Sequence, residues 1–144
     1  MDGKGEYNAG IACCLMSKTG AKPYVIKSRI GQRHPFITQD GEDREDNPNQ
    51  YIANMRSGAK AGFRYFSIHN LGMVTVLTRG NGHGVMNISL DAEEKPFAQI
   101  PVAPSREWKS FSGEVCLEDG VKSLWFSFEG DGAIDFKSFR LNEK

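Results

Sequence analysis

Residues 124–141 read LWFSFEGDGAIDFKSFRL, and this stretch decides the fold. Leu124, Phe126 and Phe128 share one parity, and a second apolar run begins at Ile134. Alternation with a period of two is typical of strands that have one buried and one wetter face. Glycines between the two runs mark a turn. The stretch therefore predicts two consecutive β-strands whose apolar sides face the core.

The same alternation recurs in residues 63–66, 74–77, 86–90 and 111–117, with turn residues between the runs. Helical spacing is hard to find, although Asn47–Ser57 has room for one turn of helix. Many short strands at regular spacing predict an all-β, antiparallel β-sandwich of the jelly-roll type. A chain of 144 residues buries about two-thirds of its unfolded surface, which is enough for one core without disulfides.

The composition changes near residue 33. Residues 1–33 contain a predicted hairpin around the turn Lys18–Ala21. A polar stretch, Gln32–Pro48, follows and carries an acidic loop. We therefore expect residues 1–33 to be a linker with a hairpin and residues 34–144 to be the sandwich domain.

Charge and motifs exclude several function classes. The chain has 18 basic and 18 acidic residues, and nucleic-acid binders normally carry a basic excess. No apolar stretch approaches the roughly 18 residues that span a bilayer, so we predict no membrane partner. Cys13, Cys14 and Cys116 lack metal-site spacing and are expected to be small buried residues. The glycine-rich Arg79–Gly84 precedes a strand pattern, so we expect a hairpin there rather than a phosphate-binding loop.

Catalysis has no positive support in the sequence. The three histidines lack metal-ligand spacing, and no Gly-x-Ser-x-Gly nucleophile motif occurs. Acidic residues are plentiful, but the sequence selects no pair of carboxylates for glycoside hydrolysis. We predict that the chain itself is not an enzyme.

Two carboxylates and three aromatic residues are candidate site residues. Asp40 ends the first strand after the boundary and Asp135 lies in the last strand, so a hard cation held by oxygen ligands would explain both. The alternative is two ordinary solvated aspartates. Trp125 alternates with the core residues Leu124 and Phe126, so its ring is expected to point away from the core. Trp108 lies at the start of a predicted strand, and Tyr51 follows a loop rich in amides and acids. Such rings stack on sugar C–H faces, although aromatic residues more often belong to a core.

From residue 34 to the C terminus, the chain contains an ordered series of short elements. They are His34–Asp40, Gln50–Ile52, Gly62–Phe66, Val74–Leu77, Arg79–Gly80, Ile100–Val102, Glu107–Phe111, Leu124–Gly130 and Ala133–Phe139. This ordered set resembles carbohydrate-binding module family 6. It also looks like the version of this module found at the C terminus of glycoside hydrolase family 43 enzymes, which act on xylan and arabinoxylan.

The resemblance implies a jelly roll with a structural Ca²⁺ near its first and last strands. The family's acidic stretch reads Ile37–Asp40 here, so Asp40 and Asp135 carry over as ligands. Thr38 replaces one acid, and Gln39 is expected to help complete a weaker site.

The resemblance also implies a sugar cleft at the loop end, formed by a tyrosine, a tryptophan and an asparagine. Tyr51 matches the tyrosine, but the other two positions hold Ser105 and Ala133. The loop-end cleft therefore looks degraded. We expect sugar binding through what remains at Tyr51, with Trp108 nearby, or through a second site on a sheet face with Trp125 as its platform.

Two functions follow from this resemblance. The first is a non-catalytic module that binds or positions xylan-type polysaccharide for an attached hydrolase. The second is a structural accessory domain that packs on the catalytic domain of the same parent chain. Residues 1–33 would connect the module to that catalytic domain. Both functions imply an extracellular parent enzyme.

Overall fold

The computed structural model describes residues 4–12, 14–17, 20–21, 36–39, 50–91 and 95–143. These residues form a short 3₁₀ turn and twelve strands. In chain order they are β1 (Gly5–Asn8), η1 (Ala9–Ile11), β2 (Cys14–Ser17), β3 (Gly20–Ala21), β4 (Phe36–Gln39), β5 (Gln50–Arg56), β6 (Lys60–Ile68), β7 (Leu71–Gly80), β8 (His83–Ser89), β9 (Ala98–Val102), β10 (Ser105–Glu114), β11 (Gly120–Asp131) and β12 (Ala133–Glu143).

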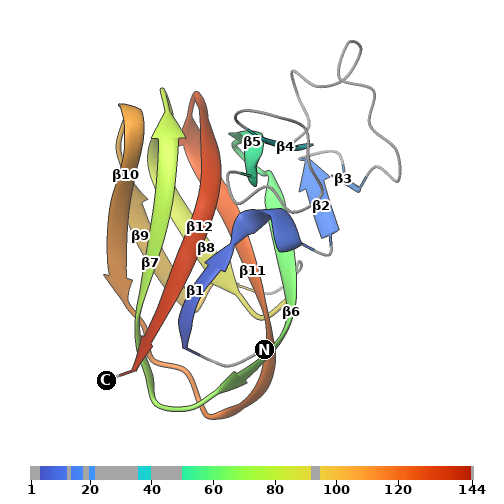
Figure 1. Ribbon diagram of the computed structural model, residues 1–144, viewed down its shortest axis with the longest axis vertical. Helices are drawn as coiled ribbons and strands as arrows, with labels where there is room; N and C mark the ends of the chain where they lie inside the picture. The colour runs from blue at the N-terminus through green and yellow to red at the C-terminus, as the bar shows by residue number, and fades with distance from the viewer. Residues whose placement is uncertain are drawn as a thin grey trace.

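The strands form two antiparallel sheets that pack face to face (Figure 1). The first, called the β12 sheet, has the order β10-β7-β12-β5-β4, with β1 also paired to β12. The second, the β11 sheet, has the order β3-β2-β6-β11-β8-β9. The predicted antiparallel β-sandwich is confirmed. No helix in the described ranges is long and apolar enough to cross a membrane.

The N-terminal strands belong to the sandwich. Strand β1 pairs with β12 from Gly5 to Asn8, and β2 pairs with β6. Ala9 is fully buried, and the Tyr7 ring packs edge-on against Phe66 with centroids 5.2 Å apart. The described part of residues 1–33 therefore contributes strands to both sheets, and the antiparallel pairing of β2 with β3 agrees with the predicted hairpin. Strands of four residues carry too little alternation to identify them from sequence.

Two local predictions are also corrected. The segment with room for a helical turn forms strand β5, because Ile52 and Met55 point into the core. The glycine-rich connection after β7 is not a hairpin, since β7 and β8 lie in different sheets. A Cβ on Gly82 would lie 2.5 Å from Ile134 Cγ2, so the crossover passes directly against β12.

An aromatic cluster joins the two sheets at the core. Phe63, Phe66 and Phe126 come from the β11 sheet, and Phe136 and Phe139 come from the β12 sheet. All five side chains are almost fully buried. Phe139 lies nearest the centre, with ring centroids 4.7 Å from Phe126 and 4.8 Å from Phe63. The buried Phe126 and Phe136 confirm the parity that the sequence predicted for their strands. In β6 the predicted alternation of residues 63–66 is wrong, because the register with β11 shifts there, so that Phe66 is buried and Tyr65 is 56% exposed.

One of the three cysteines differs from the expectation that they are buried. Cys116 is exposed and free, so it is not a buried residue. Cys14 lies in β2 opposite Gly62. Cys13 lies outside the described residues.

Candidate functional site

Tyr51 and Trp108 meet on the outer face of the β12 sheet. They come from the non-adjacent strands β5 and β10, and their ring centroids lie 5.2 Å apart at an interplanar angle of 70°. Both side chains are half-buried. Because the rings contact each other edge to face, no slot for a sugar ring lies between them.

Cations of the chain itself cover this aromatic pair. The Arg79 guanidinium lies 4.2 Å from the Trp108 ring centroid and 5.1 Å from that of Tyr51. Lys137 Nζ lies 5.4 Å from the same tryptophan. Such cation–π contacts stabilise by about 0.5–2 kcal/mol each. Arg79 therefore lies over both aromatic residues that were predicted to contact a sugar, and Lys137 lies over Trp108.

The two positions that depart from the family pattern have local backbone roles. Ser105 Oγ donates to the carbonyl of Glu107 at 2.7 Å and accepts from its N–H at 3.3 Å. The N–H of Ala133 donates to Asn81 Oδ1 at 3.0 Å. Neither position presents a side chain that could contact a sugar as tryptophan or asparagine would.

Asp135 supports an irregular point in the β5–β12 pairing. Its Oδ1 accepts from the N–H of Asn54 at 3.2 Å, and its Oδ2 accepts from Arg79 Nη2 at 3.5 Å. Asn54 has a φ of 63°, and the register shifts between Ile134 and Phe136. The Asp135 carboxylate thus holds a left-handed residue in place and orients the guanidinium that covers the aromatic pair.

The described residues do not by themselves make a calcium site. Calcium takes six to eight oxygen ligands, whereas Asp135 already faces a cation. No group of three or more metal-ligating His, Cys, Asp or Glu side chains occurs among the described residues. Thr38 and Gln39 lie in β4, two strands from β12, and their side chains are outside the description, as is Asp40. The calcium site stays a prediction.

Trp125 lies on the outer face of the β11 sheet, as its parity predicted. Its ring rests against Gly62 of β6, where a Cβ would lie 2.8 Å from each of three ring atoms. Real Cβ atoms essentially never approach so closely, so a glycine is needed for the ring to lie against the sheet. The side chain is half-buried. Trp125 is therefore an aromatic platform supported by its cross-strand partner.

Asn87 lies in β8, on the other side of β11 from Gly62, and has an acceptor without a partner. It faces Ser127, two residues along β11 from Trp125. Its Nδ2 donates to Glu129 Oε2 at 3.1 Å, but its buried Oδ1 has no hydrogen-bond partner. Asn87 is only 6% exposed. A buried oxygen without a donor costs about 1–3 kcal/mol, so it requires an explanation.

We call the group of Trp125, Gly62, Asn87 and Glu129 the Trp125 face. Sequence reasoning identified Trp125 but missed Asn87 and Glu129. Asn87 lies between the core residues Met86 and Ile88, so the alternation predicts that it points outward. Nothing in the sequence indicates that this outward residue is buried.

Comparisons with known proteins fit this architecture. No family model matches the sequence. A xylosidase/arabinosidase from Thermoclostridium stercorarium is 35% identical over 142 residues, covering 98% of this chain. The chain spans only 30% of that relative's length.

Solved structures share the fold at low identity. A family 6 carbohydrate-binding module from Clostridium cellulolyticum, in complex with xylose, has a TM-score of 0.76 at 12% identity, covering 99% of this chain and all of that module. A family 43 arabinoxylan arabinofuranohydrolase from Bacillus subtilis has a TM-score of 0.70 at 13% identity. This chain corresponds to 28% of that enzyme. The two sheets, the β1–β12 pairing and these likenesses together give the chain the jelly-roll fold of the family 6 carbohydrate-binding modules.

Proposed function

We propose that the chain is a non-catalytic carbohydrate-binding module that holds xylan-type polysaccharide for an attached glycoside hydrolase. The observation that carries the proposal is the Trp125 ring on the outer face of the β11 sheet, which rests against Gly62 and is followed along β11 by the exposed Glu129. A sugar fits both groups, because it has a C–H face for the indole and hydroxyl donors for the carboxylate.

The chemistry of binding follows from the positions of the three side chains. One sugar ring stacks on the half-buried indole of Trp125. The exposed Glu129 carboxylate accepts a hydrogen bond from a sugar hydroxyl. Asn87 Nδ2, which donates to Glu129 Oε2 at 3.1 Å, orients that carboxylate.

The names of similar proteins support the proposed xylan-type ligand and the proposed attached glycoside hydrolase. The sequence relative is a xylosidase/arabinosidase, and one structural neighbour is a module bound to xylose. Because this chain matches less than a third of two glycosidases, we propose that the rest of its parent is a catalytic domain. A polysaccharide is too large to enter a cell, so we also propose that the parent acts outside it.

Calorimetric titration with xylohexaose, and separately with a mixed-linkage glucan hexasaccharide, tests the proposed function. We expect a dissociation constant of roughly 10 μM to 1 mM for xylohexaose, which corresponds to about −7 to −4 kcal/mol. Tighter binding of the glucan would still support a carbohydrate-binding module, but its ligand would be a mixed-linkage glucan. The absence of heat with either sugar would contradict sugar binding.

The second candidate function is a structural accessory domain. It is favoured by the Tyr51–Trp108 pair, whose faces Arg79 and Lys137 already cover. Under this reading, the separately produced catalytic domain binds this chain in ultracentrifugation, and neither sugar gives heat. Sugar binding without domain association would support the first function instead.

Calcium dependence gives a separate prediction. If Asp40 ligates calcium, the ion stabilises the folded chain by about 2.7 kcal/mol at a free concentration of 100 times its Kd. We expect calcium to raise the melting temperature, chelation to reverse the rise, and Asp40→Asn to remove it. Asp131→Asn, at an exposed carboxylate, is the control. An unchanged melting temperature after chelation would refute the calcium site.

A further inference from the structure

Asn81 and Gly82 connect β7 to β8, and Asn81 is the only asparagine in the chain that is followed by glycine. An asparagine can lose ammonia when the backbone nitrogen of the next residue attacks its side-chain carbonyl carbon. A glycine in the next position lacks the Cβ that would hinder this approach. Whether the folded chain permits the reaction depends on the contacts of the groups that react.

These groups are exposed or without a partner at Asn81. Asn81 itself is exposed, and its Oδ1 accepts from the N–H of Ala133 at 3.0 Å. This bond polarises the side-chain carbonyl and stabilises the negative charge that develops on its oxygen during attack. The N–H of Gly82 and the Nδ2 of Asn81 make no hydrogen bond with any residue that the structure describes. Attack therefore breaks no hydrogen bond of the nucleophile, and no described group retains the departing nitrogen.

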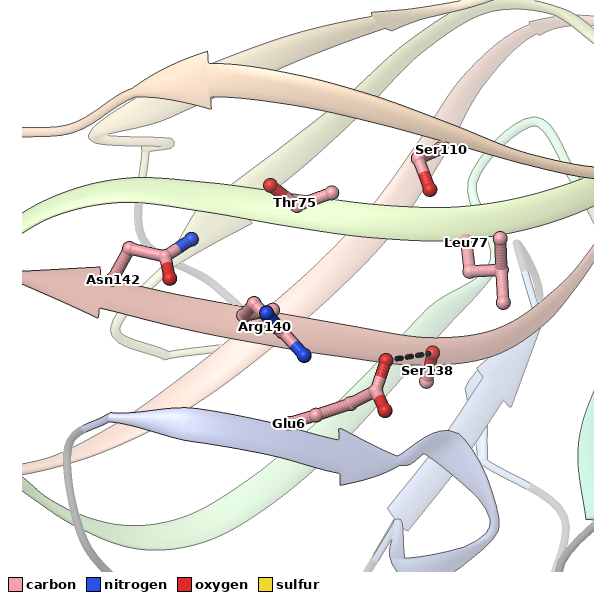
Figure 2. Close-up of a pocket in the computed structure, with 7 residues that line it drawn as sticks. All are labelled: Glu6, Thr75, Leu77, Ser110, Ser138, Arg140 and Asn142. Atoms are coloured by element: carbon pink, nitrogen blue, oxygen red, sulfur yellow. Dashed lines mark hydrogen bonds between the residues drawn. The ribbon is translucent and has the colours of Figure 1, made fainter.

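Asn142 shows the contrasting arrangement. It lines a hollow of about 400 Å³ on the outer face of the β12 sheet (Figure 2). The next residue is Glu143, which lies in β12 and pairs with Leu71 of β7. The nitrogen that would attack therefore belongs to a paired strand, and its residue carries a Cβ. Asn142 is a reference asparagine within the same chain.

We propose that Asn81 is a site of spontaneous deamidation in the folded chain. The nitrogen of Gly82 gives its proton to hydroxide and attacks Asn81 Cγ, so that a C–N bond forms. The bond from Cγ to Nδ2 breaks, and the departing group takes a proton from water and leaves as ammonia. Water then opens the cyclic imide at either carbonyl, which leaves aspartate or isoaspartate at this position.

The two products differ in their effect on the fold. Aspartate keeps an oxygen that accepts from the N–H of Ala133. Isoaspartate adds one atom to the main chain of a connection that has no slack, because a Cβ on Gly80 would lie only 2.7 Å from the Ala133 carbonyl oxygen. Arg79 precedes this connection and lies over Trp108. Isoaspartate is therefore expected to shift Arg79 relative to the tryptophan.

Peptide mass spectrometry after ageing at mildly alkaline pH tests the site, with the chain in urea as the reference. We expect Asn81 in the folded chain to be converted within about tenfold of its rate in urea, which corresponds to a local opening free energy of at most about 1.4 kcal/mol. Asn142 should be converted at least tenfold more slowly than Asn81. A larger protection of Asn81 by folding, or equal rates for the two asparagines, would overturn the proposal.

Trp108 emission tests the structural consequence. The chain has two tryptophans, so a Trp125→Phe background leaves Trp108 as the only emitter. Its emission should change in step with isoaspartate, measured by enzymatic methylation of the aged chain. Adding Asn81→Gln should abolish both changes, because a glutamine must close a six-membered ring, which forms far more slowly. Isoaspartate without an emission change would keep the site and overturn the shift of Arg79. Neither result depends on sugar binding.

Discussion

Trp125→Ala is expected to weaken binding of xylohexaose at the Trp125 face by about 100-fold, which corresponds to about 2.7 kcal/mol. The substitution removes the aromatic platform that rests against Gly62 on the outer face of the β11 sheet. A stacked aromatic ring contributes both buried area and a geometric preference. Without it, the sugar hydroxyl that pairs with Glu129 is no longer held in position.

Fluorescence isolates this face, because the chain has only two tryptophans. In Trp108→Phe, all tryptophan emission comes from Trp125, and we expect xylohexaose to change that emission with a saturable curve. Adding Gly62→Ala should weaken the response, because the new methyl group would lie 2.8 Å from the indole and displace it. An emission that stays constant through the titration would contradict sugar stacking on Trp125.

Much of the fold follows from patterns that lie within single strands. Phe126 and Phe128 are buried and Trp125 is not, as the alternation in residues 124–128 predicts. Strand β1 has no such pattern, because it is only four residues long and only Tyr7 contacts the core. Its place beside β12 depends on long-range pairing, which no local window of sequence contains.

The sites were less predictable because they depend on register between strands. Tyr51, Arg79 and Trp108 come from three strands, and their stacking depends on where β5, β7 and β10 align. Asp135 accepts hydrogen bonds from an arginine on β7 and a backbone amide on β5. A sequence shows that a carboxylate lies on a strand, but not which donor lies across from it.

Phe139→Ala is expected to destabilise the folded chain by about 3–5 kcal/mol, which is the usual range for removing a buried phenylalanine. Phe139 is 1% exposed. Its ring contacts five other aromatic rings, those of Tyr7, Phe63, Phe66, Phe126 and Phe136. Because these neighbours come from β1 and from both sheets, the cavity would loosen the sandwich at the point where its layers meet.

Urea unfolding followed by near-ultraviolet circular dichroism measures this loss, and thermal melting should show a fall of about 10 °C or more. Phe139→Leu keeps most of the volume and should lose less than half as much stability. Val121→Ala is the surface control, since Val121 is 70% exposed and exposed substitutions usually change stability by less than about 0.5 kcal/mol. Equal midpoints for Phe139→Ala and Val121→Ala would mean that the aromatic cluster does not hold the two sheets together. A large loss for Phe139→Ala alone would show that the aromatic cluster stabilises the packing of the two sheets.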